Sequence, residues 1–113
     1  MIRTTIAEYQ ENFNTLIDIM ERTGAKLVWA SSTPITSRYG KRLEDIGNYN
    51  KAAAEVMHSR HVMIDDLYSR IEPHLREMQG DDGCHFTPEG YEYLGKQVAE
   101  SILAVLSPGA SNR

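Results

Sequence analysis

The sequence has a single cysteine, no long apolar run and no excess of positive charge, and each absence excludes a class of protein. One cysteine excludes an internal disulfide framework, and no apolar stretch approaches the length needed to cross a membrane. The formal net charge of -4 offers no basic surface, so we expect no nucleic-acid partner. Residues 1 to 13 contain no apolar signal core, so we expect no export signal in this chain.

What is present suits a small globular protein. The chain has 113 residues, of which 41% are hydrophobic and 25% are charged. This length is that of one domain with one core, so we assign residues 1–113 to a single domain. We expect residues 107–113 to form a flexible tail.

Apolar residues at helical spacing predict helices at both ends of the chain. The first should span about residues 5 to 23, because Thr5 and Glu8 form a capping-box pattern and Gly24 can supply a left-handed stop. The last should span about residues 87 to 106, with Thr87 as N-cap and proline at the first helical position.

Two further helical stretches lie between these. A polar loop is expected at residues 35 to 47, followed by an amphipathic stretch that contains Ile46, Tyr49, Ala53, Val56 and Met57. The spacing of Leu67, Ile71 and Leu75 predicts a third helix, which Pro73 should kink or divide.

Two short apolar runs read as buried strands. One covers residues 25 to 32 and is closed by a Thr-Pro pair, and the other covers residues 62 to 64 and ends in two aspartates. Strands joined by a helical crossover run parallel, so the order α-β-α-β-α-α predicts an α/β fold. We expect a partial doubly wound, flavodoxin-like three-layer α/β/α domain. Parallel sheets normally contain several strands, so we expect further strands upstream of these two.

The stretch from residue 80 to residue 91, GDDGCHFTPEGY, places Asp82 three positions before His85 and then opens a helix. A histidine that acts as general base must hold one tautomer, and a carboxylate on its other ring nitrogen both orients it and stabilises the imidazolium. In such a pair Asp82 would be the orienting acid and His85 the base. A glycine between them lets the chain fold the carboxylate back toward the ring.

Other readings of the titratable residues are open. Taken alone, the Asp-x-x-His loop would be a salt bridge, and neighbouring side chains in an extended loop point apart, which disfavours a Cys84–His85 dyad. His58 and His61, with the two aspartates that follow residue 64, could suggest a metal cluster. We disfavour it because His58 should lie near a helix end and His61 at a strand start. We expect no metal and no cofactor.

Serines at the end of the first strand are candidates for the substrate site, because ligands of α/β sheets bind beyond the carboxyl ends of strands. Ser31 or Ser32 could be a nucleophile, or either could line a substrate pocket with Thr33 and Pro34. We favour pocket lining, since neither serine lies in a nucleophile turn that enters a helix.

Residues 82 to 91 closely resemble the last conserved block of the SGNH hydrolases, the GDSL-type esterases and lipases, in which an Asp-x-x-His loop leads into the final helix. Earlier segments resemble the preceding elements of such enzymes in the right order, up to about Leu106. The resemblance implies a carboxylic ester hydrolase (acylhydrolase) that acts on a small ester, with Asp82 and His85 in the roles given above.

The chain also departs from that family. It has no Gly-Asp-Ser nucleophile block and lacks the glycine and asparagine that would bind the oxyanion; residues 80 to 82 lack the serine, and Gly47 to Asn50 only imitate a Gly-x-Asn-Asp block. The chain thus resembles the C-terminal part of an SGNH hydrolase, and we expect it to be inactive alone. It could be completed by an N-terminal segment, or it could be an inactive binding module or a self-assembling homo-oligomer, most simply a homodimer. The sequence leaves the compartment of a complete protein open.

Overall fold

The computed structural model describes residues 4–36 and 43–107. The elements follow the predicted order: α1 (Ile6–Glu21), β1 (Val28–Ala30), α2 (Leu43–Arg60), β2 (Met63–Asp65), α3 (Leu67–Ile71), the 3-10 turn η1 (Glu72–His74), α4 (Leu75–Met78) and α5 (Pro88–Leu106). The third helix is divided at Pro73, as predicted. Beyond Ser107, the tail predicted for residues 107–113 lies outside the described residues.

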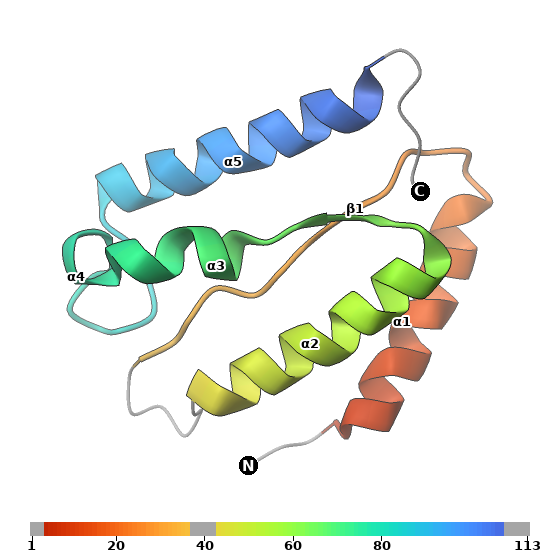
Figure 1. Cartoon of the computed structure of the whole chain (residues 1–113), viewed down its shortest axis with the longest axis horizontal. Helices are drawn as coiled ribbons and strands as arrows, with labels where there is room; N and C mark the ends of the chain where they lie inside the picture. Colours follow the sequence, from red (N-terminus) through yellow and green to blue (C-terminus); the bar gives the residue numbers. More distant parts are fainter. Residues whose placement is uncertain (1–3, 37–42, 108–113) are drawn as a thin grey trace.

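The two strands form a parallel pair in which Val28 faces Met63 and Ala30 faces Asp65. The backbone N–H of Ser31 continues this pairing by donating to the carbonyl oxygen of Asp65 at 3.0 Å. α5 lies on one side of the strands and α1 and α2 lie on the other (Figure 1). The three-layer α/β arrangement with a short parallel sheet is therefore confirmed.

Local signals set the predicted helix ends. Glu8 donates its backbone N–H to the Thr5 hydroxyl at 3.1 Å, and the Glu8 carboxylate accepts from the Thr5 N–H at 3.0 Å, which completes the capping box. α1 ends at Glu21, and Gly24, two residues after the C-cap Arg22, adopts the left-handed φ of +78° that turns the chain away. At α5 the Thr87 hydroxyl accepts the N–H of Gly90 at 3.1 Å. The predicted N-caps and the predicted stop are confirmed.

α2 begins at Leu43, so the prediction of a loop that extends to residue 47 was wrong at its C-terminal end. The first turn of α2 carries Glu44 and Asp45, whose charges favour a helix N-terminus although they add no apolar periodicity. The apolar spacing becomes visible only from Ile46 onward. Residues 37–42 of that predicted loop lie outside the described residues.

The largest buried cluster lies between α1, α2 and the sheet. Its buried members are Ile17, Leu27, Val56, Met57 and Val62, and Phe13, Trp29 and Ile64 pack against it. On the α5 side, Ile71, Leu94 and Val105 are buried. Both faces of the short sheet are thus covered by apolar side chains, as a parallel sheet requires.

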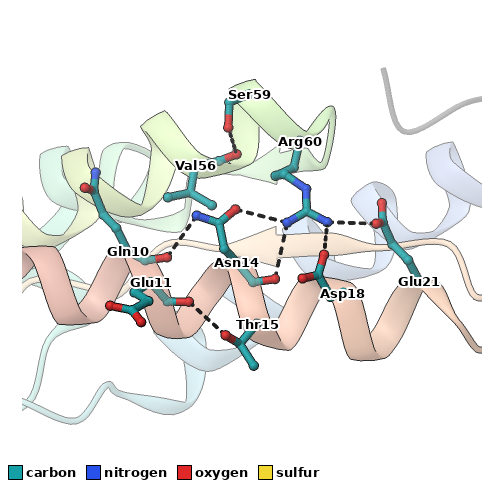
Figure 2. Close-up of polar contacts among 9 residues, drawn as sticks. All are labelled: Gln10, Glu11, Asn14, Thr15, Asp18, Glu21, Val56, Ser59 and Arg60. Carbon is teal, nitrogen blue, oxygen red and sulfur yellow. Dashed lines mark hydrogen bonds and ion pairs between the residues drawn. The ribbon is translucent and has the colours of Figure 1, made fainter.

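Arg60, at the end of α2, ties that helix to the exposed side of α1 (Figure 2). Its guanidinium donates to the Asn14 side-chain oxygen at 3.0 Å and to the carboxylates of Asp18 and Glu21 at 2.5 and 2.9 Å. The hydrogen bond to Asp18 and the nearby negative charges raise the pKa of Arg60. The network joins the last turn of α2, just before β2, to the second half of α1.

Several large apolar side chains of the outer helices stay exposed. They include Leu16, Ile19 and Met20 on α1 and Ile102, Leu103 and Leu106 on α5, which are 41–66% exposed.

None of the helices described is both long enough and apolar enough to cross a membrane.

Candidate active site

The Asp82–His85 loop connects α4 to α5 and is closed at its base by main-chain hydrogen bonds. The N–H of Gly80 donates to the His85 carbonyl oxygen at 2.8 Å, and the N–H of Thr87 donates to the Met78 carbonyl oxygen at 2.8 Å. Gln79 and Phe86 form an isolated antiparallel bridge between these two bonds. The loop therefore leaves and rejoins the fold at fixed points.

Asp82 organises the inside of the loop. Its Oδ1 accepts the backbone N–H groups of Cys84 and His85, each at 2.9 Å. Its Oδ2 lies 2.6 Å from Nδ1 of the His85 ring. Gly83 turns the chain between them with φ +68°, a conformation that a side chain would strain. The predicted contact between Asp82 and His85 is present, and the glycine between them has the role expected of it.

These contacts keep the Asp82 carboxylate ionised. The hydrogen bond from His85, followed by those from the backbone N–H groups of Cys84 and His85, lowers the pKa of Asp82 from 3.8 to about 2. Asp82 is therefore ionised at neutral pH and can only accept a hydrogen bond, so Nδ1 must be the donor. In the neutral ring this leaves Nε2 without a proton, as a general base requires.

The imidazole ring of His85 is exposed on the surface of the loop. The His85 side chain is 73% exposed. Across the described residues, no hydrogen bond joins Nε2 to another part of the chain. A nucleophile delivered by another segment could thus approach this nitrogen without displacing a protein contact.

The start of α5 fixes where the loop ends. Thr87 caps the helix, and Gly90 lies in its first turn against the end of α4. A Cβ at Gly90 would come within 2.5 Å of the Met78 carbonyl oxygen, the same atom that accepts from Thr87. Helix α5 can approach this closely only because residue 90 has no side chain.

The four residues predicted to line a pocket lie on the chain that leaves β1. Ser31 is buried, and its hydroxyl donates to Asp66 at 3.0 Å and accepts the N–H of Tyr68 at 2.9 Å. Ser32 is exposed, and its backbone exchanges two hydrogen bonds with the Asn50 side chain. This geometry leaves little freedom for the Ser31 hydroxyl, whereas the side chain of Ser32 is accessible.

Thr33 is half-buried, and Pro34 is fully buried just beyond Ser32. The same segment then runs toward the loop that carries His85 (Figure 1). The backbone N–H of Thr36 donates to the Gly83 carbonyl oxygen at 2.7 Å, so the predicted pocket segment and the predicted catalytic loop meet at this point. Assignment of these four residues to a pocket stays a prediction.

Two residues that connect these segments, Thr36 and Gln79, were not predicted from the sequence. The Thr36 hydroxyl donates to Oε1 of Gln79 at 2.7 Å, and Nε2 of Gln79 donates to the Pro34 carbonyl oxygen at 2.9 Å. These pairs are 43 and 45 residues apart in the chain, and no local pattern signals such contacts.

The two histidines considered for a metal site lie at the end of α2, apart from this loop, whereas Cys84 lies within it. His58 is in the last turn of α2, and His61 follows that helix with φ +60°. Among the residues that the structure describes, no three or more His, Cys, Asp or Glu side chains are grouped so that they could hold a metal ion. Cys84 is a free, half-buried thiol.

Comparison with known proteins gives a structural relative. The fold matches the esterase domain of the ORF1 protein from the zebrafish ZfL2-1 retrotransposon with a TM-score of 0.77 and 16% sequence identity. The match covers 88% of this chain but only 60% of that one. No family model matches the sequence, and no curated protein matches it. At this sequence identity the comparison shows a shared fold, and this chain spans 60% of the length of that relative.

Proposed function

We propose that this chain is the acid–base part of an ester hydrolase of the SGNH type, with His85 as general base and Asp82 as its orienting acid. The observation that carries the proposal is the 2.6 Å contact between Asp82 Oδ2 and His85 Nδ1 on a ring whose other nitrogen is open. The fold shared with an esterase domain supports the same reaction class.

The reaction requires a serine that this chain does not provide in a recognisable nucleophile block. A serine hydroxyl delivered beside His85 would attack the ester carbonyl while Nε2 takes its proton, and Asp82 would stabilise the imidazolium that forms. The imidazolium would then give that proton to the leaving alcohol. Water would hydrolyse the acyl-serine by the same proton transfers, which regenerates both the serine and the neutral ring.

Substrate binding is proposed for the chain that leaves β1. Ser32 and Thr33 present accessible or half-buried side chains on a segment that meets the His85 loop at Gly83. Ser31 and Pro34 are buried in the same segment and would support the accessible side chains from the core side. We propose that these four residues line the site of a small ester, with neither serine as nucleophile.

The chain spans 60% of its structural relative, so we propose that an N-terminal segment with a Gly-Asp-Ser block completes the enzyme.

The test is turnover of p-nitrophenyl acetate. The 113-residue chain alone should be no faster than free imidazole at equal concentration, because it supplies neither the covalent step nor oxyanion donors. Fusion of an SGNH hydrolase segment that carries Gly-Asp-Ser should restore turnover, and the same segment with Ser→Ala should not. Rapid hydrolysis by the unfused chain would refute the proposal that an N-terminal segment supplies the nucleophile.

A second candidate function is self-assembly without catalysis, and a specific observation favours it. β1 pairs with β2 on one side, and within the described ranges no strand pairs with its other edge. Strand edges and exposed apolar side chains on flanking helices promote association. We propose that in the absence of an N-terminal segment two copies associate as a homodimer.

A further inference from the structure

Three sets of hydrogen bonds hold the Asp82–His85 loop in place. The third set involves neither the Asp82 carboxylate nor the His85 ring. The main-chain bonds of Gly80 and Thr87 close its base, and the Asp82 carboxylate holds its interior. The third set joins the loop to the chain beyond β1, through Thr36 and Gln79. The first two sets fix the shape of the loop, and the third fixes its position relative to the end of the sheet.

Gln79 uses both ends of its side-chain amide. The Pro34 carbonyl oxygen can only accept, so the atom that faces it must be Nε2, and Oε1 is then turned toward the Thr36 hydroxyl. Gln79 is also the residue whose backbone pairs with Phe86 at the loop base. One residue thus contacts both the closing bridge of the loop and the strand-end segment.

Thr36 completes the connection. Its backbone N–H donates to the carbonyl oxygen of Gly83, the residue between Asp82 and Cys84, while its hydroxyl donates to Gln79. Pro34, two residues earlier, is fully buried, so the segment that bears Thr36 is anchored in the core. Thr36 therefore connects the chain at the end of β1 to the turn at Gly83, and this connection places the Asp82–His85 loop relative to the sheet.

We propose that Thr36 and Gln79 are positioning residues, which hold the His85 imidazole at the end of the sheet where a nucleophile and an ester must meet it. The catalytic half of this inference rests on the proposed function. The positional half does not, because it concerns only how the loop is held. Thr36 is exposed and its hydrogen bonds compete with water, so their loss should free the loop with little effect on global stability.

The experiment on the 113-residue chain uses Gln79→Met, which removes both amide contacts at similar size, and Thr36→Val, which removes the hydroxyl. The matched control is Gln10→Met, since Gln10 Nε2 likewise donates to a distant backbone carbonyl, that of Ala52, at 3.0 Å. Nuclear magnetic resonance would measure exchange of the Thr36 N–H and of the His85 Nδ1–H with water. We expect faster exchange of the Thr36 N–H in Gln79→Met and Thr36→Val, while the His85 Nδ1–H, which Asp82 holds inside the loop, should exchange as in the wild type. Neither proton should change in Gln10→Met or Thr36→Ser.

The same variants in the fused, active protein test the catalytic half. Misplacement of the ring should lower kcat on the order of 10- to 100-fold with KM little changed, since small errors in the position of a catalytic group carry costs of this size. Thr36→Ser keeps the hydroxyl and should keep kcat. A variant that raises KM alone would instead assign these residues to substrate binding and overturn the positioning role.

The two proposals fail in different ways. If the fused wild-type protein does not hydrolyse the ester, the proposed function fails, while the exchange measurement still decides whether Thr36 and Gln79 hold the loop. If the fused protein is active and Gln79→Met changes neither proton exchange nor kcat, the positioning inference is wrong and the proposed function stands.

Discussion

Gly90 of α5 lies so close to the Met78 carbonyl oxygen that a Cβ at residue 90 would approach that oxygen to 2.5 Å. The contact packs the first turn of α5 onto the end of α4, at the two points from which the Asp82–His85 loop departs. Close helix packing and loop position are therefore linked at a single glycine.

Gly90→Ala should destabilise the protein by about 1–3 kcal/mol, the usual cost of overpacking against atoms that cannot yield. The matched control is Gly95→Ala in the same helix, where nothing lies within 4 Å of an added Cβ. That change should stabilise by roughly 0.5–1 kcal/mol, because alanine favours the helix interior. Urea unfolding of both variants measures the difference, and equal midpoints would show that α4 and α5 do not pack as described.

The pKa of Asp82 offers a direct check on the loop. A carbon-detected titration should place the midpoint of this carboxyl group at about 2. In His85→Ala the midpoint should rise toward 3.8 without reaching it, because the largest cause of the shift is lost while the backbone N–H donors remain. His74→Ala, which removes a ring 3.6 Å from Glu77, is the control and should leave Asp82 unchanged.

The sign of the pH effect follows from that shift. The pKa of Asp82 is lower in the folded chain than its ordinary value, so its contribution to stability is present above about pH 4. This contribution is lost as the pH falls through the folded value near 2. An Asp82 midpoint that stays near 3.8 in the wild-type chain would contradict the hydrogen bonds assigned to its carboxylate.

Association is predicted from the edge of β1 that no strand in the described part of the chain covers, and from the exposed apolar residues of α1 and α5. Light scattering should give a mass approaching twice the 12.8 kDa of the chain as concentration rises. Fusion of the N-terminal segment should reduce this association, since the segment would cover the same edge. A clean monomer at high concentration would rule out the homodimer.

The parts of the fold that the sequence predicted are those with local causes. Thr5 and Glu8 mark the start of α1 within one turn, and Thr87 with Pro88 marks the start of α5. The parallel arrangement followed from the helical crossover between the two apolar runs. The start of α2 was missed because its first turn is charged, without an apolar repeat.

The site was predictable only in part for the same reason. Asp82 and His85 are three residues apart and share one loop, so their contact could be inferred from spacing and from a glycine between them. Thr36 and Gln79 meet across 43 residues, and their pairing depends on how the sheet end and α4 are placed in space. Gly90 carried a weak signal, since glycine is disfavoured within a helix unless another backbone approaches closely.

The measurement that tests the central claim most directly is kcat/KM for ester hydrolysis by the fused, serine-containing protein and its loop variants. His85→Ala should remove the serine-dependent rate, and Asp82→Asn should lower it on the order of 10²- to 10⁴-fold by spoiling the tautomer and leaving the imidazolium unsupported. Cys84→Ala should stay close to wild type, because Asp82 contacts only the backbone of residue 84. Unchanged kcat/KM in His85→Ala would show that the Asp82–His85 contact is a salt bridge without a catalytic role.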